Sequence, residues 1–210
     1  MSAPPPKPPK PGKVKCYRAV YNYAAQQADE LSFQEGDVIY VTETEGGEGW
    51  WQACCNGKAG LVPSNYVAEN AEPISFPLHE AAKRGNVAFM RECLSNGVAV
   101  NSMDKSGSTP IYWASHGGHE EALSILLDQP NAHVDAQNKL GDTPLHAAAW
   151  RGHARCAELL LEAGASQTVR NADNRTALDL AKDPATAAEL KRYSALPVTD
   201  DCDNVASDSD

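Results

Sequence analysis

Two tryptophans in succession, Trp50 and Trp51, stand between two aromatic segments in the N-terminal part of the chain. Residues 19–23 read AVYNY, and residues 60–67 read GLVPSNYV and add a proline and another tyrosine. Flat aromatic faces pack against proline rings, and a ligand that is already a polyproline II helix loses little entropy on binding. These residues predict a groove for a proline-rich peptide, which is a binding site rather than a catalytic centre.

Strand alternation distinguishes the two tryptophans. Successive side chains of a strand point to opposite faces, so we expect Trp50 to contact the ligand and Trp51 to pack on the other side. Three acids, Glu43, Glu45 and Glu48, precede the pair and should favour basic ligands.

Four short strands are expected around this pair, at residues 14–20, 37–42, 50–55 and 58–63. Asn56-Gly57 between the last two is typical of a two-residue hairpin turn. Several short strands in so short a segment indicate a small barrel.

These segments together resemble an SH3 domain: residues 19–23 match its ALYDY motif, residues 29–37 its diverging turn and residues 60–67 its terminal signature. The resemblance implies a domain over residues 14–70, with Glu30 pairing with a basic residue of the ligand. Asn22 replaces the usual Asp and Leu61 a frequent aromatic, which leaves the exact ligand preference open. The groove residues that the resemblance implies are Tyr21, Tyr23, Trp50, Pro63, Asn65 and Tyr66.

A second pattern recurs after residue 72, as PLHEAAKRG, TPIYWASHG, TPLHAAAWRG and a worn TALDLA. Its period is about 33 residues, and it resembles ankyrin repeats. The copies are expected at 72–104, 105–137 and 138–170, with a degenerate cap at 171–193. Each copy should give two short helices, and the extra residue near 129–131 should lie in a loop. The fold class is therefore multidomain: a small all-β SH3 barrel, a linker of a few residues around 68–73, and an all-α-type ankyrin solenoid.

One exposed column is expected on the repeats. By register it holds Lys83, His116 and Trp150, with Arg84 and Arg151 beside them. Trp150 is large and apolar, which makes it a candidate hot spot for a partner, with packing against neighbouring helices or the first domain as the alternative. Tyr112 and Trp113 are expected to pack within the second repeat.

Several residues could suggest catalysis or metal binding. The four histidines at 79, 119, 146 and 153 recur at fixed repeat positions, which favours a structural role over a metal pair at 116 and 119. The six cysteines form no CxxC pair and fit no disulfide framework, and Cys54-Cys55 has no neighbouring histidine arrangement to activate a thiolate. We expect no enzyme activity, no cofactor and no metal.

Charge and composition bear on the partners and the compartment. The net charge of −10 disfavours nucleic acid, and no apolar run is long enough to span a membrane. The start lacks the apolar core of a signal peptide, so reduced thiols in the cytoplasm are expected.

The two ends differ in charge. Residues 1–13 carry Lys7, Lys10 and Lys13 among prolines, and contain two PxxPxK matches to SH3 ligands. This arm is predicted to be disordered, and so is the acidic tail 194–210, where Ser207 is a candidate for acidophilic phosphorylation.

The order of domains resembles a family of small intracellular adaptors. The resemblance implies a scaffold that binds basic, proline-rich motifs (PxxPxR/K) through its SH3 groove and another signalling protein through its repeats. It also implies Src-type tyrosine kinases as partners and an indirect, signalling effect on osteoclast formation and bone resorption. Two alternatives stay open: a subunit regulated by its own arm lying in the groove, and a cysteine-dependent enzyme.

Overall fold

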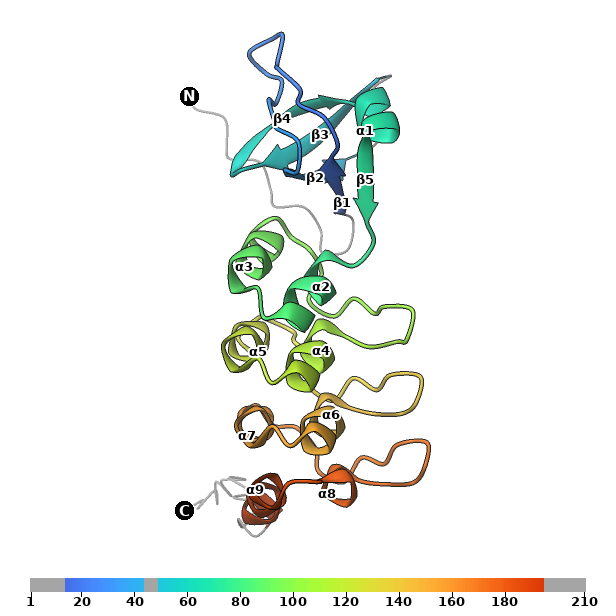
Figure 1. Cartoon of the computed structure of the whole chain (residues 1–210), viewed down its shortest axis with the longest axis vertical. Helices are drawn as coiled ribbons and strands as arrows, with labels where there is room; N and C mark the ends of the chain where they lie inside the picture. The colour runs from blue at the N-terminus through green and yellow to red at the C-terminus, as the bar shows by residue number, and fades with distance from the viewer. Residues whose placement is uncertain (1–13, 44–48, 195–210) are drawn as a thin grey trace, which may run out of the picture.

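The computed structural model describes residues 14–43 and 49–194, arranged as a small β-rich domain stacked on one end of a row of helix pairs (Figure 1). The expectations for the arm, the acidic tail with Ser207, and the loop acids Glu45 and Glu48 lie outside the described residues. The predicted fold class, an SH3 barrel followed by an ankyrin solenoid, is confirmed.

The first domain contains one antiparallel sheet of five strands in the order β4-β3-β2-β1-β5. Its elements are β1 (Lys15–Ala19), β2 (Val38–Glu43), β3 (Trp50–Cys55), β4 (Lys58–Pro63), α1 (Ser64–Asn70) and β5 (Ala71–Ile74). The β3–β4 hairpin turns at Asn56 and Gly57, which have φ of 51° and 74°. Positive φ at both positions is what a type I′ turn requires, so the predicted turn is confirmed.

The expected linker around residues 68–73 is wrong. These residues are the end of α1 and most of β5, which pairs antiparallel with β1 from Cys16↔Ile74 to Ala19↔Ala71. The sheet therefore extends beyond residue 70, and only Ser75 and Phe76 separate it from the first repeat helix. The sequence signal was weak because Pro73 argues against a strand, but β5 lies at the sheet edge, where proline is tolerated.

The repeats form two rows of helices (Figure 1). The first row is α2 (Pro77–Arg84), α4 (Pro110–Gly117), α6 (Pro144–Arg151) and α8 (Ala177–Leu180). The second row is α3 (Val87–Ser95), α5 (Glu120–Leu127), α7 (Ala154–Glu162) and α9 (Pro184–Ser194). The expected degenerate cap is thus a complete helix pair with a shortened first helix.

The repeat motif sets the ends of the first-row helices. The hydroxyls of Thr109, Thr143 and Thr176 accept hydrogen bonds from backbone N–H groups at the starts of α4, α6 and α8, as N-caps do. Proline follows the cap in α4 and α6, where its missing N–H costs nothing. In the first copy Phe76 replaces the threonine, and no side chain caps α2.

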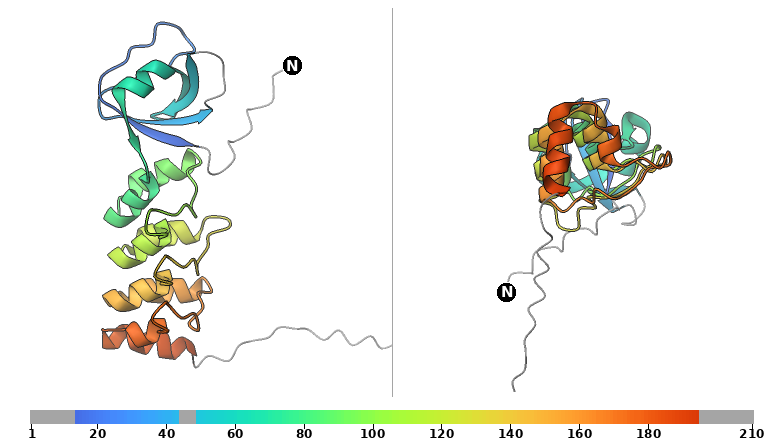
Figure 2. Two further views of the ribbon diagram at one scale, coloured as in Figure 1. Left: turned by 90° about the vertical axis from the view of Figure 1, so that its right-hand side faces the viewer. Right: turned by 90° about the horizontal axis from the view of Figure 1, so that it is seen from below.

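Loops between repeats project to one side of the stack, and in the end-on view of Figure 2 they lie together. Equivalent side chains hold them: Asp104, Asn138 and Asn171 each accept two backbone N–H bonds from the residues two and four positions later. These short polar side chains satisfy backbone donors that a loop cannot pair with itself. The extra residue of the second copy lies in a turn, with Asn131 at φ 65°.

The sheet of the first domain is apolar on both faces. Ile39, Val41, Ala53 and Val62 belong to the core inside the barrel, and Trp51 packs against the same core. Of the residues that alternate with these, Val38, Tyr40 and Cys54 pack against the repeats. This double burial explains the uninterrupted apolar run of residues 38–41, which a strand with one solvent face would not show.

A row of side chains crosses four strands on the outer face. Ile74, Cys16, Tyr40 and Cys54 lie opposite one another on β5, β1, β2 and β3, and all pack into the core of the repeats. Tyr40 is fully buried, and its hydroxyl lies 3.8 Å from the Sγ atom of Cys93 on α3. One hydrophobic core therefore runs from the outer face of the sheet through the repeats, and the interior of the barrel holds a second core.

Because Tyr40 belongs to both domains, we predict that Tyr40→Ala destabilises both. The loss should be about 3–5 kcal/mol of unfolding free energy, as for other buried aromatic truncations. Urea titrations followed by tryptophan fluorescence and by far-UV circular dichroism should shift together.

Tyr40→Phe is the matched control, since it keeps the ring and removes only the weak contact with Cys93. It should cost less than about 1 kcal/mol. If Tyr40→Ala shifted the unfolding transition of the β-rich domain alone, the result would contradict a core shared by the two domains.

Candidate peptide groove and partner surface

The long loop between β1 and β2 carries the first groove aromatic. Tyr23 and Phe33 form an isolated antiparallel bridge across the loop, with N–H···O distances of 2.9 and 3.0 Å. Asn22 fixes the loop by accepting the N–H of Glu35 at 2.7 Å, so the replacement of the usual Asp keeps an acceptor in place. In Figure 1 the loop extends away from the repeats, so the helix stack does not cover it.

Tyr66 on α1 completes an aromatic cluster. Its ring centroid lies 5.4 Å from that of Tyr23 and 5.3 Å from that of Phe33. Its hydroxyl donates a hydrogen bond to the carbonyl of Tyr21. The side chain of Tyr21 is 61% exposed and does not line the hollow described below, so it is the one predicted groove residue that stands apart.

The two tryptophans lie on opposite faces of β3, as predicted. Trp50 pairs with Pro63 across the β3–β4 ladder, and both line the groove. Trp51 packs against the barrel core, with its ring 6.4 Å from Tyr17. Alternation along the strand therefore directs one indole to the groove and the other to the core.

Glu30 lies half-buried beside Trp50. Its Oε2 atom accepts hydrogen bonds from the Tyr23 hydroxyl at 3.0 Å and the Gln26 N–H at 2.7 Å. Burial raises the pKa of Tyr23, and the hydrogen bond to the Glu30 carboxylate raises it further. These two bonds fix the Glu30 carboxylate at the wall of the hollow.

Six of the seven predicted groove residues surround one open hollow of about 570 Å³. They are Tyr23, Glu30, Trp50, Pro63, Asn65 and Tyr66. A smaller hollow of about 110 Å³ adjoins it between Trp50, Leu61 and the acids Asp29 and Glu30. Within the described residues no lysine or arginine lines either hollow, so the groove is aromatic and acidic.

Sequence reasoning missed Gln26, Gln27 and Glu69, which also line the hollow. Their signal was their place in the long loop and at the end of α1, close in the chain to the motif residues Tyr23 and Tyr66.

On the repeats, the predicted column is present and has two further members. The rings of His116 and Trp150 stack at 6.0 Å, and Lys83 lies with its Nζ atom 4.9 Å from the ring of Trp113. Lys182 lies 4.3 Å above the ring of Trp150. Trp113 and Lys182 were not predicted as members. Trp113 was expected to pack within the second repeat, but its indole N–H donates to Asp104, the last residue of the first repeat, at 2.8 Å.

Arg151 lies beside the column, with its guanidinium 5.6 Å from the ring of Trp150. Trp150 is 41% exposed, so the expectation of an exposed aromatic at this position is confirmed.

The periodic histidines are structural, as predicted. Nε2 atoms of His79 and His146 lie 3.0 and 3.1 Å from carbonyls of the following loop, at Ser108 and Arg175. His119 and His153 do the same toward the preceding repeat, at 3.0 and 3.2 Å. Each histidine therefore joins two repeats.

The described cysteines are held as thiols. Burial raises the pKa of Cys16, Cys55 and Cys93 to about 12 and that of Cys156 to about 11. Thiolates are the reactive form, so none of these four is activated at neutral pH.

Among residues 14–43 and 49–194, no group of three or more His, Cys, Asp or Glu side chains could hold a metal ion. No helix in this part of the chain has the length and apolar character needed to cross a bilayer.

Comparison with known proteins agrees with this geometry. The SH3 domain family matches residues 18–64, and two ankyrin repeat families match residues 50–138 and 118–161. Osteoclast-stimulating factor 1 of Rattus norvegicus is 57% identical over 195 residues, which cover 93% of this chain and 91% of the relative. The proteins of the same name from Bos taurus and Danio rerio are 58% and 57% identical over 91% of this chain and 89% of their own length.

The chain belongs to the osteoclast-stimulating factor 1 family. Its SH3 domain and ankyrin repeats are protein-interaction modules, which gives the chain an adaptor role.

The buried thiols generate a prediction. Iodoacetamide at pH 8 should leave Cys16, Cys55, Cys93 and Cys156 unmodified over a time in which the unfolded chain is fully alkylated, because burial disfavours their thiolates. Peptide mass mapping reads each site, and the same reaction in urea is the control. Rapid labelling of Cys55 or Cys156 in the native protein would support the alternative of a cysteine-dependent enzyme.

Proposed function

We propose that this protein is a cytoplasmic signalling adaptor that binds basic, proline-rich peptides in its SH3 groove and a second protein on its ankyrin column. The convergence of Tyr23, Trp50, Pro63 and Tyr66 beside the acid Glu30 carries the first half of the proposal. Aromatic and proline faces accept proline rings, and the acid pairs with an Arg or Lys of the ligand.

The second half rests on Lys83, His116, Trp150 and Arg151, which the repeats place together on one exposed face. Indole and guanidinium groups are frequent among residues that dominate binding energy. By likeness to the relatives, whose name states that they stimulate osteoclasts, the pathway served is osteoclast formation and bone resorption.

Trp50→Ala should abolish binding of a PxxPxR peptide. Loss of a central aromatic in a groove costs about 2–4 kcal/mol, so a micromolar ligand should fall outside the measurable range. Isothermal titration calorimetry of the intact chain measures this. Trp150→Ala, an aromatic truncation on the other surface, is the matched control and should bind the peptide as the parent does.

Glu30→Gln tests the charge preference of the groove. It should weaken the PxxPxR peptide by about 1 kcal/mol and leave a peptide with Ala in place of the Arg unaffected. The effect of Glu30→Gln on the binding of the PxxPxR peptide should become smaller at high salt. An equal loss of affinity for both peptides would mean that Glu30 only holds Tyr23 and Gln26 in place.

The open alternative, in which the arm occupies the groove, predicts a different result. Deleting residues 1–12 should then raise the affinity for added peptide, whereas an unchanged affinity favours binding in trans.

A further inference from the structure

Aromatic and cationic side chains follow one another along the first-row helices and the connection between α8 and α9. We call this set the aromatic–cation column: Lys83, Trp113, His116, Trp150 and Lys182. Successive members are 4.9, 5.6, 6.0 and 4.3 Å apart, measured between ring centroids or from an Nζ atom to a centroid. The column runs from the first repeat to the fourth, so it crosses the whole solenoid. Contacts between cations and ring faces hold the long lysine side chains against the rings.

The cations at this surface have no acidic partner among the described residues. Arg84, Arg155 and Arg192 each pair with a glutamate, but no ion pair of residues 14–43 and 49–194 includes Lys83, Arg151 or Lys182. Such a concentration of unpaired positive charge is unexpected in a chain whose net charge is −10.

The surroundings of His116 give the same picture. Burial lowers the pKa of this histidine, and the positive charges of Arg151 and Lys83 lower it further. Lys83, Arg151 and Lys182 all lie on ring faces of this surface, so it presents positive charge to an approaching partner.

A pocket of about 360 Å³ adjoins the column at Trp150. Trp150, Leu140, Leu180 and Tyr112 give it apolar walls, and Leu140 is 65% exposed although it is a large apolar side chain. The pocket is large enough for one bulky apolar side chain of a partner.

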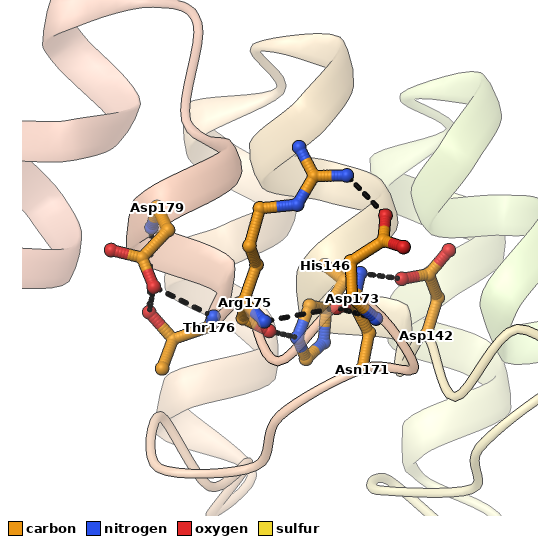
Figure 3. A network of polar contacts seen from close by, with 7 residues as sticks. All are labelled: Asp142, His146, Asn171, Asp173, Arg175, Thr176 and Asp179. Atoms are coloured by element: carbon orange, nitrogen blue, oxygen red, sulfur yellow. Dashed lines mark hydrogen bonds and ion pairs between the residues drawn. The ribbon is translucent and has the colours of Figure 1, made fainter.

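Other residues that line the pocket are held by polar contacts (Figure 3). Asn171 donates to Asp142 at 2.8 Å, and Asp173 pairs with Arg175. His146 lies 3.1 Å from the carbonyl of Arg175. Asp173 is therefore paired with Arg175 and Asp142 is held by Asn171, whereas Arg151 and Lys182 lie on the ring of Trp150 without an ion pair among the described residues.

We propose that this surface binds an acidic segment of a partner protein, with one large apolar side chain in the Trp150–Leu140 pocket and carboxylates on Arg151, Lys182 and Lys83. The inference deepens the second half of the proposed function, on which it rests, and names the chemistry of that partner. Apolar burial would supply the anchor, and the charges would supply the orientation and the rate of association.

Charge also separates the two binding sites. The SH3 groove is lined by acids and the column by cations, so a basic proline-rich ligand is repelled by the column and an acidic segment by the groove. One adaptor can then hold two partners at once without exchanging them. A second copy of this chain is a poor occupant, because two molecules of charge −10 repel each other.

The test uses fluorescence anisotropy of labelled dodecapeptides with the full chain. The acidic pool has a central Leu flanked by Asp and Glu; in a second pool Lys replaces the acids, and in a third Ser replaces the Leu. We expect the acidic Leu pool to bind at least tenfold more tightly than either of the others, and the binding to weaken with salt.

Trp150→Ala and the pair Arg151→Glu with Lys182→Glu should each weaken the acidic Leu pool at least tenfold. Lys58→Glu on the distant β3–β4 hairpin is the matched charge control and should change nothing. Calorimetry of the PxxPxR peptide with every variant shows that the fold is intact. It also tests peptide binding by the SH3 groove separately, so a failure of that proposal can be told apart from a failure of partner binding at the column.

Three results would overturn the inference: no binding of the acidic Leu pool, equal binding of the Lys pool, or binding that ignores the column substitutions. A last measurement uses a full-length variant in which the tail acids are changed to Asn: Asp200, Asp201, Asp203, Asp208 and Asp210. If the acidic pool binds only that variant, the occupant is the chain's own acidic tail and the assignment to a partner protein fails.

Discussion

The structure depends on the burial of one strand face against one repeat helix. The cross-strand row Ile74, Cys16, Tyr40 and Cys54 packs into the same core as Cys93 of α3. Repeat solenoids need a cap at each end, because the outermost repeat otherwise exposes apolar surface. Here the SH3 sheet serves as the first cap, which explains why Cys93 of the first repeat is fully buried.

This arrangement fixes what the two binding surfaces can do together. The SH3 groove lies in the loop and helix that face away from the repeats, while the aromatic–cation column follows the first-row helices (Figure 1). A shared core and a connection of only Ser75 and Phe76 oppose independent motion of the domains. Under the proposed function, two partners would therefore be held at a set distance and orientation, rather than on a flexible tether.

Much of the fold followed from the sequence because its signals are periodic or local. The repeat spacing placed the helix pairs, the Asn56-Gly57 turn placed the hairpin, and alternation assigned Trp50 and Trp51 to opposite faces. Most residues around the hollow could be named for the same reason: Tyr23, Pro63 and Tyr66 lie in fixed motifs. Tyr21 was the exception, since its side chain is exposed while its carbonyl binds Tyr66.

What the sequence did not predict arises between segments. The strand β5 was read as a linker because Pro73 and the polar residues around it hide a strand that exists only by pairing with β1. Cys54 and Tyr40 looked like ordinary strand residues, and their role in joining the domains depends on a helix much later in the chain. Likewise Lys182 joined the column only because the shortened α8 brings it over Trp150.

The central claim is that the SH3 domain and the repeats form one rigid unit through Tyr40 and α3. Backbone amide residual dipolar couplings of the full chain in a weakly aligning medium test it most directly. The account predicts that a single alignment tensor fits the couplings of the sheet and of all four helix pairs. Two tensors that differ in magnitude or orientation would show that the domains move independently, and would contradict the account.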